Sequence, residues 1–400
     1  MTDADLSPFR LGVNYWPGEV AMAWLEAYDP RVTRRDFRRL ASAGLDSVRI
    51  FLRWEDAQPT PTTVDAATLS RLLDIADAAV ETGVTLIVTL FVGHMSGVNW
   101  IPTWATGGPD GDPRFRVISN GRARENWGIR NWYTDEAIVT AQERLAATTA
   151  AALAGHPGVW AWDLGNENSN CTIPPNHTSG EQWLERMTSA IRRNDPGRPL
   201  TIGIHMEDLE QDRQIGPAEA ARWCEIVSMH GYPIYTDWAA GPTDDRLLPF
   251  LAEITRWLAG GAEILFEEFG LSTTRPDQTE QPLLVSEAAA AAYTGRALDG
   301  LRTAGCTGAL LWCFSDYASA LDALPPFDHA THERTFGLWR ADGTPKPAVA
   351  ELTARVGAPR RAPPSPDAWL DIDQETFDDN RRLHLARLYR RYRRRDGDTL

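Results

Sequence analysis

Two glutamates, each at the end of a short apolar segment, have the residue type and the position for paired-carboxylate chemistry. Glu167 follows the apolar run 159–164, and Glu268 lies near the end of a second such segment, 262–270. An apolar run interrupted by one acid is typical of a strand covered on both faces, as in a parallel sheet. Two carboxyl groups that flank a glycosidic bond can cleave it, because one protonates the leaving oxygen and the other attacks the anomeric carbon. The sequence therefore predicts a glycosidase site if the fold brings the two strand ends together.

Strand-like and helix-like patterns alternate along the chain and indicate how the two ends could meet. Strands separated by helices form a parallel sheet, and eight such units close into a (β/α)8 TIM barrel whose chemistry lies at the C-terminal strand ends. An open doubly wound sheet is the alternative, but it needs a glycine-rich phosphate loop after the first strand, and residues 12–16 do not form one. The predicted strands are 10–16, 47–52, 84–90, 159–164, 200–204, 226–229, 263–266 and 308–312, and the predicted helices are 31–43, 66–82, 135–154, 181–193, 244–258 and 284–304.

Two further segments lie outside this alternation. Residues 94–134 are rich in Gly, Asp, Arg, Asn and Trp without a regular pattern, which predicts a long irregular loop that forms a wall or lid of the active site. Residues 1–356 are expected to form the barrel domain, and 357–400 a Pro-rich connector with a C-terminal helix at 377–395. That helix is expected to pack on the barrel or on a neighbouring subunit, which leaves a homo-oligomer open. Its apolar stripe consists of Leu385, Leu388, Tyr389 and Tyr392.

The composition excludes several classes of partner. A net charge of −15 and a pI near 5.0 argue against nucleic acids and anionic membranes. No apolar run reaches the roughly 20 residues of a membrane span, and residues 1–7 have neither the basic region nor the apolar core of a secretory signal. The four cysteines show no CxxC spacing, which favours reduced thiols. We expect a cytoplasmic protein.

Five short motifs stand at or just after predicted strands two, four, six, seven and eight. Each motif alone is common, but their order along the chain is specific. In that order they are Arg49, Asn166-Glu167, His230-Gly231-Tyr232, Glu268-Phe269-Gly270 and Trp312.

This series resembles glycoside hydrolase family 5, a family of retaining (β/α)8 glycosidases, over residues 10–355. The resemblance implies that Glu167 is the acid/base and Glu268 the nucleophile, and it implies no cofactor and no metal. Glu267 is the alternative nucleophile, because the sequence offers two adjacent acids. Adjacent strand residues face opposite sides, so only one of the two is expected to point into the barrel mouth. The pKa of the acid is expected to be raised by burial and by the neighbouring charge.

The resemblance also implies a set of sugar-binding and supporting residues. Asn166 would hold the 2-hydroxyl of the sugar, and Tyr232 would donate a hydrogen bond to the nucleophile. Arg49 would lie close to the nucleophile, His230 belongs to the His-x-Tyr motif, and Trp312 would lie under the sugar. We expect all five at the substrate site.

The chain departs from the family pattern after strand three, where a His-Asn pair is usual. Here His94 fills the place of the histidine, and Asn99 and Trp100 follow it at a distance as candidate substrate contacts. Glu207, beside Asp208, is a candidate for reading the axial 2-hydroxyl of mannose. The histidines after strands three, five and six lack HxH or HxxxH spacing, which favours sugar hydrogen bonding over metal binding.

The amino-acid sequences of segments 93–97, 205–210 and 229–235 resemble those of a bacterial branch of the family. Members of this branch act as exo-β-mannosidases on short mannosides, including Manβ1-4GlcNAc. Long loops after strands three, four and eight would close one end of the cleft and favour exo action. The prediction is a retaining exo-β-glycosidase, a β-mannosidase, whose partner is a small oligosaccharide. Alternatives within the chemistry are an endo-β-mannanase, a β-glucosidase or a transglycosylase. The alternative of another class is a non-catalytic carbohydrate-binding barrel, which the presence of both carboxylates disfavours.

Overall fold

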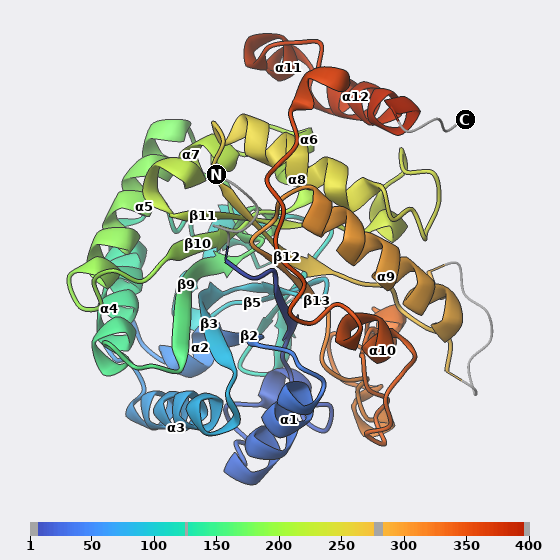
Figure 1. Ribbon diagram of the computed structural model, residues 1–400. Helices are drawn as coiled ribbons and strands as arrows, with labels where there is room; N and C mark the ends of the chain where they lie inside the picture. Colours follow the sequence, from blue (N-terminus) through green and yellow to red (C-terminus); the bar gives the residue numbers. More distant parts are fainter. Residues whose placement is uncertain (1–6, 125–126, 276–282, 396–400) are drawn as a thin grey trace.

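Eight parallel strands form the centre of the molecule and curl into a barrel surrounded by helices (Figure 1). The computed structural model describes residues 7–124, 127–275 and 283–395. The strands follow the order β10-β9-β3-β2-β1-β13-β12-β11. A parallel bridge between His205 and His230 joins the two edges of this sheet, and the His230 N–H donates to the Ile204 carbonyl at 2.8 Å. The predicted (β/α)8 barrel is confirmed.

The barrel strands are β1 (Arg10–Asn14), β2 (Ser47–Arg53), β3 (Thr85–Val92), β9 (Val159–Asn166), β10 (Leu200–Gly203), β11 (Ile226–His230), β12 (Glu263–Phe269) and β13 (Gly308–Leu311). The longer helices around them are α1 (Pro30–Ser42), α3 (Ala66–Thr82), α4 (Glu136–Ala152), α5 (His177–Arg192), α7 (Pro217–Trp223), α8 (Leu247–Leu258) and α9 (Glu287–Thr303). Short helices are α2 (Trp54–Ala57), α6 (Met206–Glu210) and α10 (Ala348–Thr353).

The interior of the barrel has an apolar layer and a charged layer. Ala161 of β9 belongs to a small buried cluster with Ile87, Leu265 and neighbouring residues. Two positions further along the same strand, Asp163 faces inward and is also fully buried. The intervening Trp162 packs outward and donates its indole N–H to Asp195 at 2.9 Å. The period of two along a strand thus places the charged layer nearer the C-terminal strand ends.

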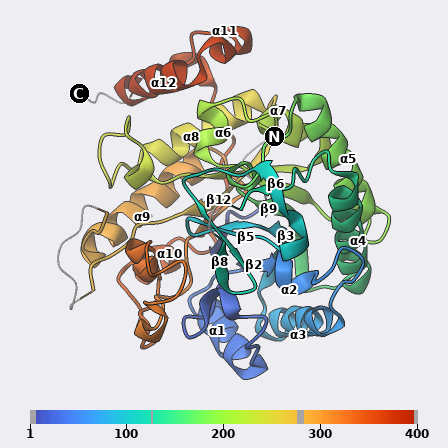
Figure 2. The same ribbon diagram turned by 180° about the vertical axis from the view of Figure 1, so that it is seen from behind.

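The segment 94–134 is more regular than its sequence pattern predicts. It contains a small sheet in the order β4-β5-β7-β8, and three of its strands, β5, β6 and β8, are labelled in front of the barrel in Figure 2. Short runs such as Val117-Ile118, which are buried here, were the signal for strands in this segment. The expectation of an irregular loop was wrong. The five strands are β4 (His94–Met95), β5 (Val98–Trp100), β6 (Thr106–Asp110), β7 (Arg116–Ser119) and β8 (Arg122–Arg124).

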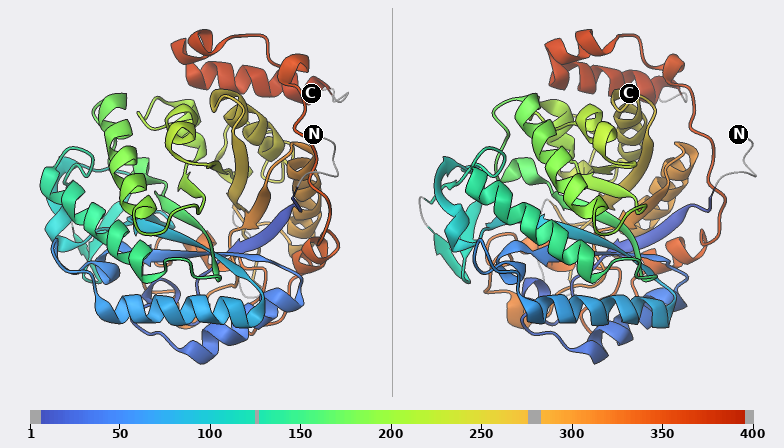
Figure 3. Two further views of the ribbon diagram at one scale, coloured as in Figure 1. Left: turned by 60° about the vertical axis from the view of Figure 1, so that its left-hand side comes forward. Right: turned by 90° about the vertical axis from the view of Figure 1, so that its left-hand side faces the viewer.

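The C-terminal extension forms two helices rather than one, α11 (Gln374–Asp379) and α12 (Arg381–Arg395), which meet at Asn380. They lie outside the ring of helices, and α12 packs against α6 and α8 (Figures 1 and 3). The Tyr389 hydroxyl donates to Asp244 at 2.6 Å, and the Tyr392 hydroxyl donates to Glu253 at 3.1 Å. The apolar stripe of α12 is buried against the chain's own barrel, so it gives no support to a contact with a neighbouring subunit.

Among the described residues, no helix has both the length and the apolar character needed to cross a membrane. Most of the segment 1–7, from which we expect no secretory signal, lies outside the described residues.

Candidate active site

A cavity of about 660 Å³ opens at the C-terminal ends of the barrel strands. Strands β9, β11 and β12 place side chains in it directly, and the segment 94–134 and the loop after β13 form its walls. Of the residues expected at the site, those that line the cavity are His94, Asn166, Glu167, Glu207, His230, Tyr232, Glu268 and Trp312.

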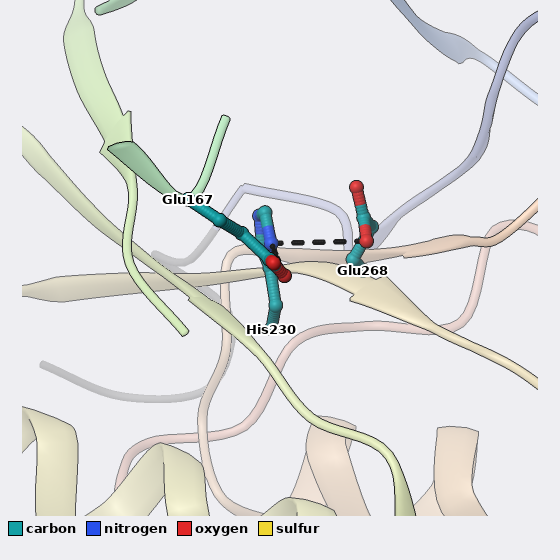
Figure 4. A group of neighbouring side chains, drawn as sticks. All are labelled: Glu167, His230 and Glu268. Carbon is teal, nitrogen blue, oxygen red and sulfur yellow. Dashed lines mark hydrogen bonds and ion pairs between the residues drawn. The ribbon is translucent and has the colours of Figure 1, made fainter. Parts of the chain in front are cut away.

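Glu167 and Glu268 face each other across this cavity, with His230 between them (Figure 4). A carboxylate oxygen of each glutamate and a ring nitrogen of His230 all lie within 4.8 Å of one another. His230 Nδ1 is 3.1 Å from Glu167 Oε1 and 3.7 Å from Glu268 Oε2. Within the described residues, this is the group whose donor atoms are close enough together to hold a metal ion. The site needs none for acid/base and nucleophilic chemistry by its carboxyl groups.

The end of β9 fixes the direction of Glu167. Glu167 has a φ of +47°, a left-handed conformation that costs a non-glycine residue on the order of 1–3 kcal/mol. Its N–H donates to the Gly203 carbonyl at 3.0 Å, and Asn170 donates to its Oε2 at 3.0 Å. The turn therefore holds the carboxylate at the cavity with backbone and side-chain hydrogen bonds together.

The end of β12 departs from simple strand alternation. Phe266 pairs with Ala309 and Phe269 with Leu311, so three steps along β12 match two along β13. This irregularity lets both Glu267 and Glu268 reach Arg49, at 3.4 Å and 2.9 Å. The expectation that the two acids face opposite sides was wrong. Only Glu268 lines the cavity, whereas Glu267 is fully buried inside the barrel.

Arg49 lies beneath the cavity and does not line it. Its Nη1 donates to Glu268 Oε1 at 2.9 Å, and its Nη2 donates to Asp163 Oδ2 at 2.7 Å. Gly203 makes room for the guanidinium, because a Cβ there would lie 3.0 Å from Nη2. Burial and the charge of Glu267 raise the pKa of Asp163 to about 6, although Arg49 acts in the opposite direction. Arg49 thus binds the carboxylates from below the cavity.

His230 lies close to the carboxylates of Glu167, Glu267 and Glu268, at 3.1, 3.5 and 3.7 Å. Burial lowers the pKa of His230, but the Glu268 charge and hydrogen bonds to Glu167 and Glu267 outweigh burial and raise it to about 10. Burial raises the pKa of Glu167, but His205 and the hydrogen bond with His230 outweigh burial and hold it well below its usual range. The expectation of a raised pKa for this acid is therefore not met, because His205 and the His230 ring nitrogen 3.1 Å from Glu167 Oε1 favour the ionised carboxylate.

The pKa of Glu268 is shifted in the opposite direction and lies above its usual value. Burial raises its pKa, and the charge of Glu167 adds to this, whereas His230, Arg49 and the hydrogen bond from Tyr232 act against it. The Tyr232 hydroxyl donates to Glu268 Oε2 at 2.8 Å, and together with Arg49 it gives each carboxylate oxygen one donor. Both bonds favour the ionised form of Glu268.

Comparison with known proteins agrees with this geometry. The family model described as Cellulase (glycosyl hydrolase family 5) matches residues 5–316. The chain belongs to glycosyl hydrolase family 5. The family expected from the order of the motifs is confirmed.

Individual proteins resemble the chain at moderate identity. The exo-β-1,4-mannosidase Op5Man5 from Opitutaceae bacterium strain TAV5 is 27% identical, with a TM-score of 0.71 over 90% of this chain and 61% of its own. A GH5_18 variant from Streptomyces cattleya, in complex with Manβ1-4GlcNAc, shares the fold at 24% identity and a TM-score of 0.74, over 94% of this chain and 88% of its own. A putative mannan endo-1,4-beta-mannosidase 5 of Oryza sativa subsp. japonica is 24% identical over 69% of this chain and 60% of its own. The chain thus spans less than two thirds of Op5Man5 and of the rice protein.

Two expected contacts lie elsewhere in this family 5 structure. Asn99 is fully buried outside the cavity. Its Oδ1 is hydrogen-bonded to His94 Nδ1 at 2.7 Å, and its Nδ2 donates to the Asn170 carbonyl at 2.9 Å. Trp100 lines a separate cavity of about 580 Å³ and not the one with the glutamates. The hairpin β4–β5 explains both positions, because it turns the strand away from the barrel mouth after His94.

Several residues of the cavity were not found from the sequence. Glu333, in the loop after β13, accepts hydrogen bonds from Trp312 Nε1, Ser96 Oγ and the Tyr235 hydroxyl, each at 3.1 Å. It lies 21 positions beyond Trp312, in a loop whose sequence has no pattern. Others are Phe115, Arg114, Glu210, Asp237 and Arg382.

A wall separates the two cavities. It consists of the small sheet and the loop after β13, which are joined by the bond from Ser96 to Glu333 and by a two-bond ion pair between Arg116 and Asp328 at 2.6 and 2.9 Å. Phe327 on one side of Asp328 lines the 580 Å³ cavity, and Ala330 on the other side lines the catalytic one. The cleft across the barrel mouth is thereby divided.

Proposed function

We propose that this protein is a retaining exo-β-glycosidase, a β-mannosidase that releases mannose from short β-mannosides such as Manβ1-4GlcNAc or manno-oligosaccharides. The carboxylate pair at the head of a walled cavity carries the proposal. The name of Op5Man5 and the Manβ1-4GlcNAc bound by the Streptomyces cattleya variant support mannose as the sugar released.

The separation of the two carboxylates supports a retaining mechanism. Their nearest oxygens lie within 4.8 Å, close to the roughly 5–5.5 Å of retaining enzymes and below the roughly 6.5–9.5 Å that leaves room for a water. Glu268, oriented by Arg49 and Tyr232, attacks the anomeric carbon while Glu167 gives its proton to the glycosidic oxygen. The C–O bond to the leaving group breaks as the ester to Glu268 forms. Glu167 then takes a proton from the water that hydrolyses this ester.

The proton for the first step is stored beside the acid. The raised pKa of His230, about 10, favours its protonated form at neutral pH, and its Nδ1 lies 3.1 Å from Glu167 Oε1. Transfer along this hydrogen bond converts the imidazolium–carboxylate pair into a neutral imidazole and a protonated Glu167. This shift reconciles the low pKa of Glu167 with its role as an acid.

The cavity has a direction, which supports exo action. The acid serves the leaving oxygen, so the leaving group lies on the Glu167 side and the terminal sugar lies on the side of Glu268 and Trp312. Beyond Trp312 the wall begins with Glu333, which is 8% exposed. A chain that continued past the terminal sugar would meet this wall.

The remaining contacts fit a single bound sugar. Asn166 donates to the His94 carbonyl at 3.0 Å, and its buried Oδ1 accepts no bond from any part of the chain that the structure describes. A sugar hydroxyl would satisfy this oxygen, since an unpaired buried acceptor costs about 1–3 kcal/mol. Burial lowers the pKa of His94, so it stays a neutral donor or acceptor beside Glu167. Trp312 offers an aromatic face.

An endo-β-mannanase is the second candidate, favoured by the name of the rice relative and disfavoured by the wall. We further propose a cytoplasmic location, which the four free, buried cysteines support.

A substrate panel tests the proposal. We expect 4-nitrophenyl β-mannoside to exceed the β-glucoside and β-galactoside in kcat/KM, and mannohexaose to lose one mannose at a time from the non-reducing end. Dominant glucoside hydrolysis would reject the mannosidase assignment. Early release of mannobiose and mannotriose would favour the endo enzyme, and no turnover of any glycoside would favour a binding barrel.

A further inference from the structure

The C-terminal helix α12 reaches the outer end of the catalytic cavity. Arg382, in its first turn, lines that cavity together with Glu210 and Asp237. Its Nη2 donates to Asp237 Oδ2 at 2.6 Å, and its Nε lies 3.6 Å from Glu210 Oε2. The helix is held in place by its buried stripe, so the backbone that carries Arg382 is fixed to the barrel.

The path from the acid to Arg382 is continuous. Glu167 interacts with His205, which directly precedes α6, and α6 ends at Glu210. Glu210 is fixed on its other oxygen by the indole N–H of Trp238 at 2.7 Å. Because the acid faces the leaving oxygen, the end of the cavity at α6 and α12 belongs to the leaving group.

A second hollow lies beside Arg382. A groove of about 580 Å³ runs along α12 and is bordered by Leu383, Ala386 and Arg390. It shares Asp237 and Arg382 with the catalytic cavity. A second hollow therefore adjoins the proposed leaving-group end, whereas the opposite end is bounded by the wall.

We propose that α12 completes the leaving-group subsite and that Arg382 is its specificity-determining residue, selecting a leaving sugar that bears an acetamido group. This inference rests on the proposed β-mannosidase function. An arginine offers only donors and a carboxylate only acceptors. An acetamido group has one of each, because its carbonyl accepts from the Arg382 guanidinium while its N–H donates to Glu210 or Asp237. A hexose hydroxyl also donates and accepts, but through a single oxygen, whereas the N–H and the carbonyl oxygen of an acetamido group lie on different atoms and reach partners that are farther apart.

The test compares Arg382→Ala with the control Arg387→Ala. Arg387 lies on the same helix but does not line the cavity, and its substitution breaks an ion pair with Asp371 whose two hydrogen bonds are 2.7 and 2.9 Å long. For Manβ1-4GlcNAc, Arg382→Ala is expected to raise KM about tenfold with kcat little changed, the effect of one charge-assisted hydrogen bond made equally in ground and transition states. For Manβ1-4Man the rise is smaller. For β-mannosyl fluoride, whose leaving group is a single atom, no change is expected, and Arg387→Ala changes none of the three.

Two results would overturn the inference. One is an unchanged KM for Manβ1-4GlcNAc in Arg382→Ala, and the other is an equal loss on β-mannosyl fluoride, which would indicate a structural role. Arg382→Lys, which keeps the charge, is expected to give an intermediate KM.

Binding of N-acetylglucosamine by calorimetry separates this inference from the proposed function. Weaker binding to Arg382→Ala than to the parent and Arg387→Ala supports the subsite whichever sugar the enzyme releases. Equal binding to all three proteins contradicts the subsite even if β-mannosides are hydrolysed.

Discussion

The two ends of the catalytic cavity are built differently. At the nucleophile end, Arg49 is fully buried and binds Glu268 from a strand in the barrel wall. At the proposed leaving-group end, the side chains of Arg114 and Arg382 are 48% and 56% exposed and come from a loop and the C-terminal helix. Breaking a buried pair costs about 3–5 kcal/mol, whereas an exposed pair contributes about 0–1 kcal/mol. We therefore propose that the buried end fixes the reaction and that the exposed end selects the leaving group.

The largest effect is expected at the buried end. Glu268→Ala removes the proposed nucleophile, and kcat on 4-nitrophenyl β-mannoside should fall at least about 10⁴-fold. The matched control is Glu207→Ala, which removes a carboxylate of the same cavity from its exposed end, where it is paired with Arg114. We expect less than a tenfold loss for the control. Turnover by Glu268→Ala within tenfold of the parent would show that another group is the nucleophile.

Glu167→Ala tests which end holds the leaving group. Loss of a general acid costs about 10²–10⁴-fold, and the cost grows as the leaving group becomes more basic. We expect a large loss of kcat/KM on Manβ1-4GlcNAc and little loss on 2,4-dinitrophenyl β-mannoside, whose phenolate leaves without a proton. Azide should accelerate the variant on the activated substrate and give β-mannosyl azide. Equal losses on both substrates would contradict the acid role.

His230→Asn separates storage of the proton from its delivery. The pKa of His230 is raised from 6.5 to about 10 by the carboxylates of Glu167, Glu267 and Glu268, against burial and the charge of Arg49. A raised pKa means that the ion pairs stabilise the fold fully below pH 6.5 and lose this contribution as pH rises through about 10.

Without the imidazolium, Glu167 must hold the proton itself. We therefore expect the basic limb of kcat/KM for His230→Asn to move to lower pH, with a loss of about 10²-fold at neutral pH, the scale of general acid catalysis. Profiles of both proteins on 4-nitrophenyl β-mannoside check this. An unchanged basic limb would rule out His230 as the proton store.

The smallest change in rate is expected from opening the wall. Ser96→Ala combined with Arg116→Ala removes both contacts that join the small sheet to the loop after β13. The ion pair is partly exposed, so stability should change by only about 1 kcal/mol and aryl mannoside turnover by less than about threefold. Internal cleavage of mannohexaose should appear. The control is Arg186→Ala, which breaks an ion pair with Glu136 between α5 and α4. If the double variant still releases only single mannose units, the wall is not the cause of exo action.

The sequence predicted the parts of the molecule in which regular strands place the residues. Five predicted residues lie at or just after the C-terminal ends of barrel strands, and all five line one cavity: Glu167, Glu268, His230, Tyr232 and Trp312. Adjacent barrel strands bring their ends together whatever the loops do. The apolar run of β9 and the motif order were sufficient signals.

The remainder depends on loops and irregularities that local patterns do not encode. Asn99 and Trp100 follow a barrel strand in sequence, but the β4–β5 hairpin turns them away. Glu333 and Arg382 reach the cavity from distant loops and a helix, so their positions depend on tertiary packing. Because of the irregularity in β12, Glu267 and Glu268 do not face opposite sides as simple strand alternation predicts. Two adjacent acids in one strand were a sequence signal of this departure. The sequence predicted a helix from residue 181, whereas α5 begins at His177. Asn176 was a signal for this earlier start, because its side chain caps the helix by accepting a hydrogen bond from the Ser179 N–H at 2.9 Å.

Trapping the covalent intermediate tests the central claim most directly. In 2-deoxy-2-fluoro-β-mannosyl fluoride the leaving group departs without an acid and the fluorine slows hydrolysis of the ester. Intact mass should rise by one fluoromannosyl unit, and peptide mapping should place it on Glu268. A label on Glu267 or Glu167, or no label together with α-mannose as the first product by NMR, would contradict the assignment of Glu268 as the nucleophile of a retaining enzyme.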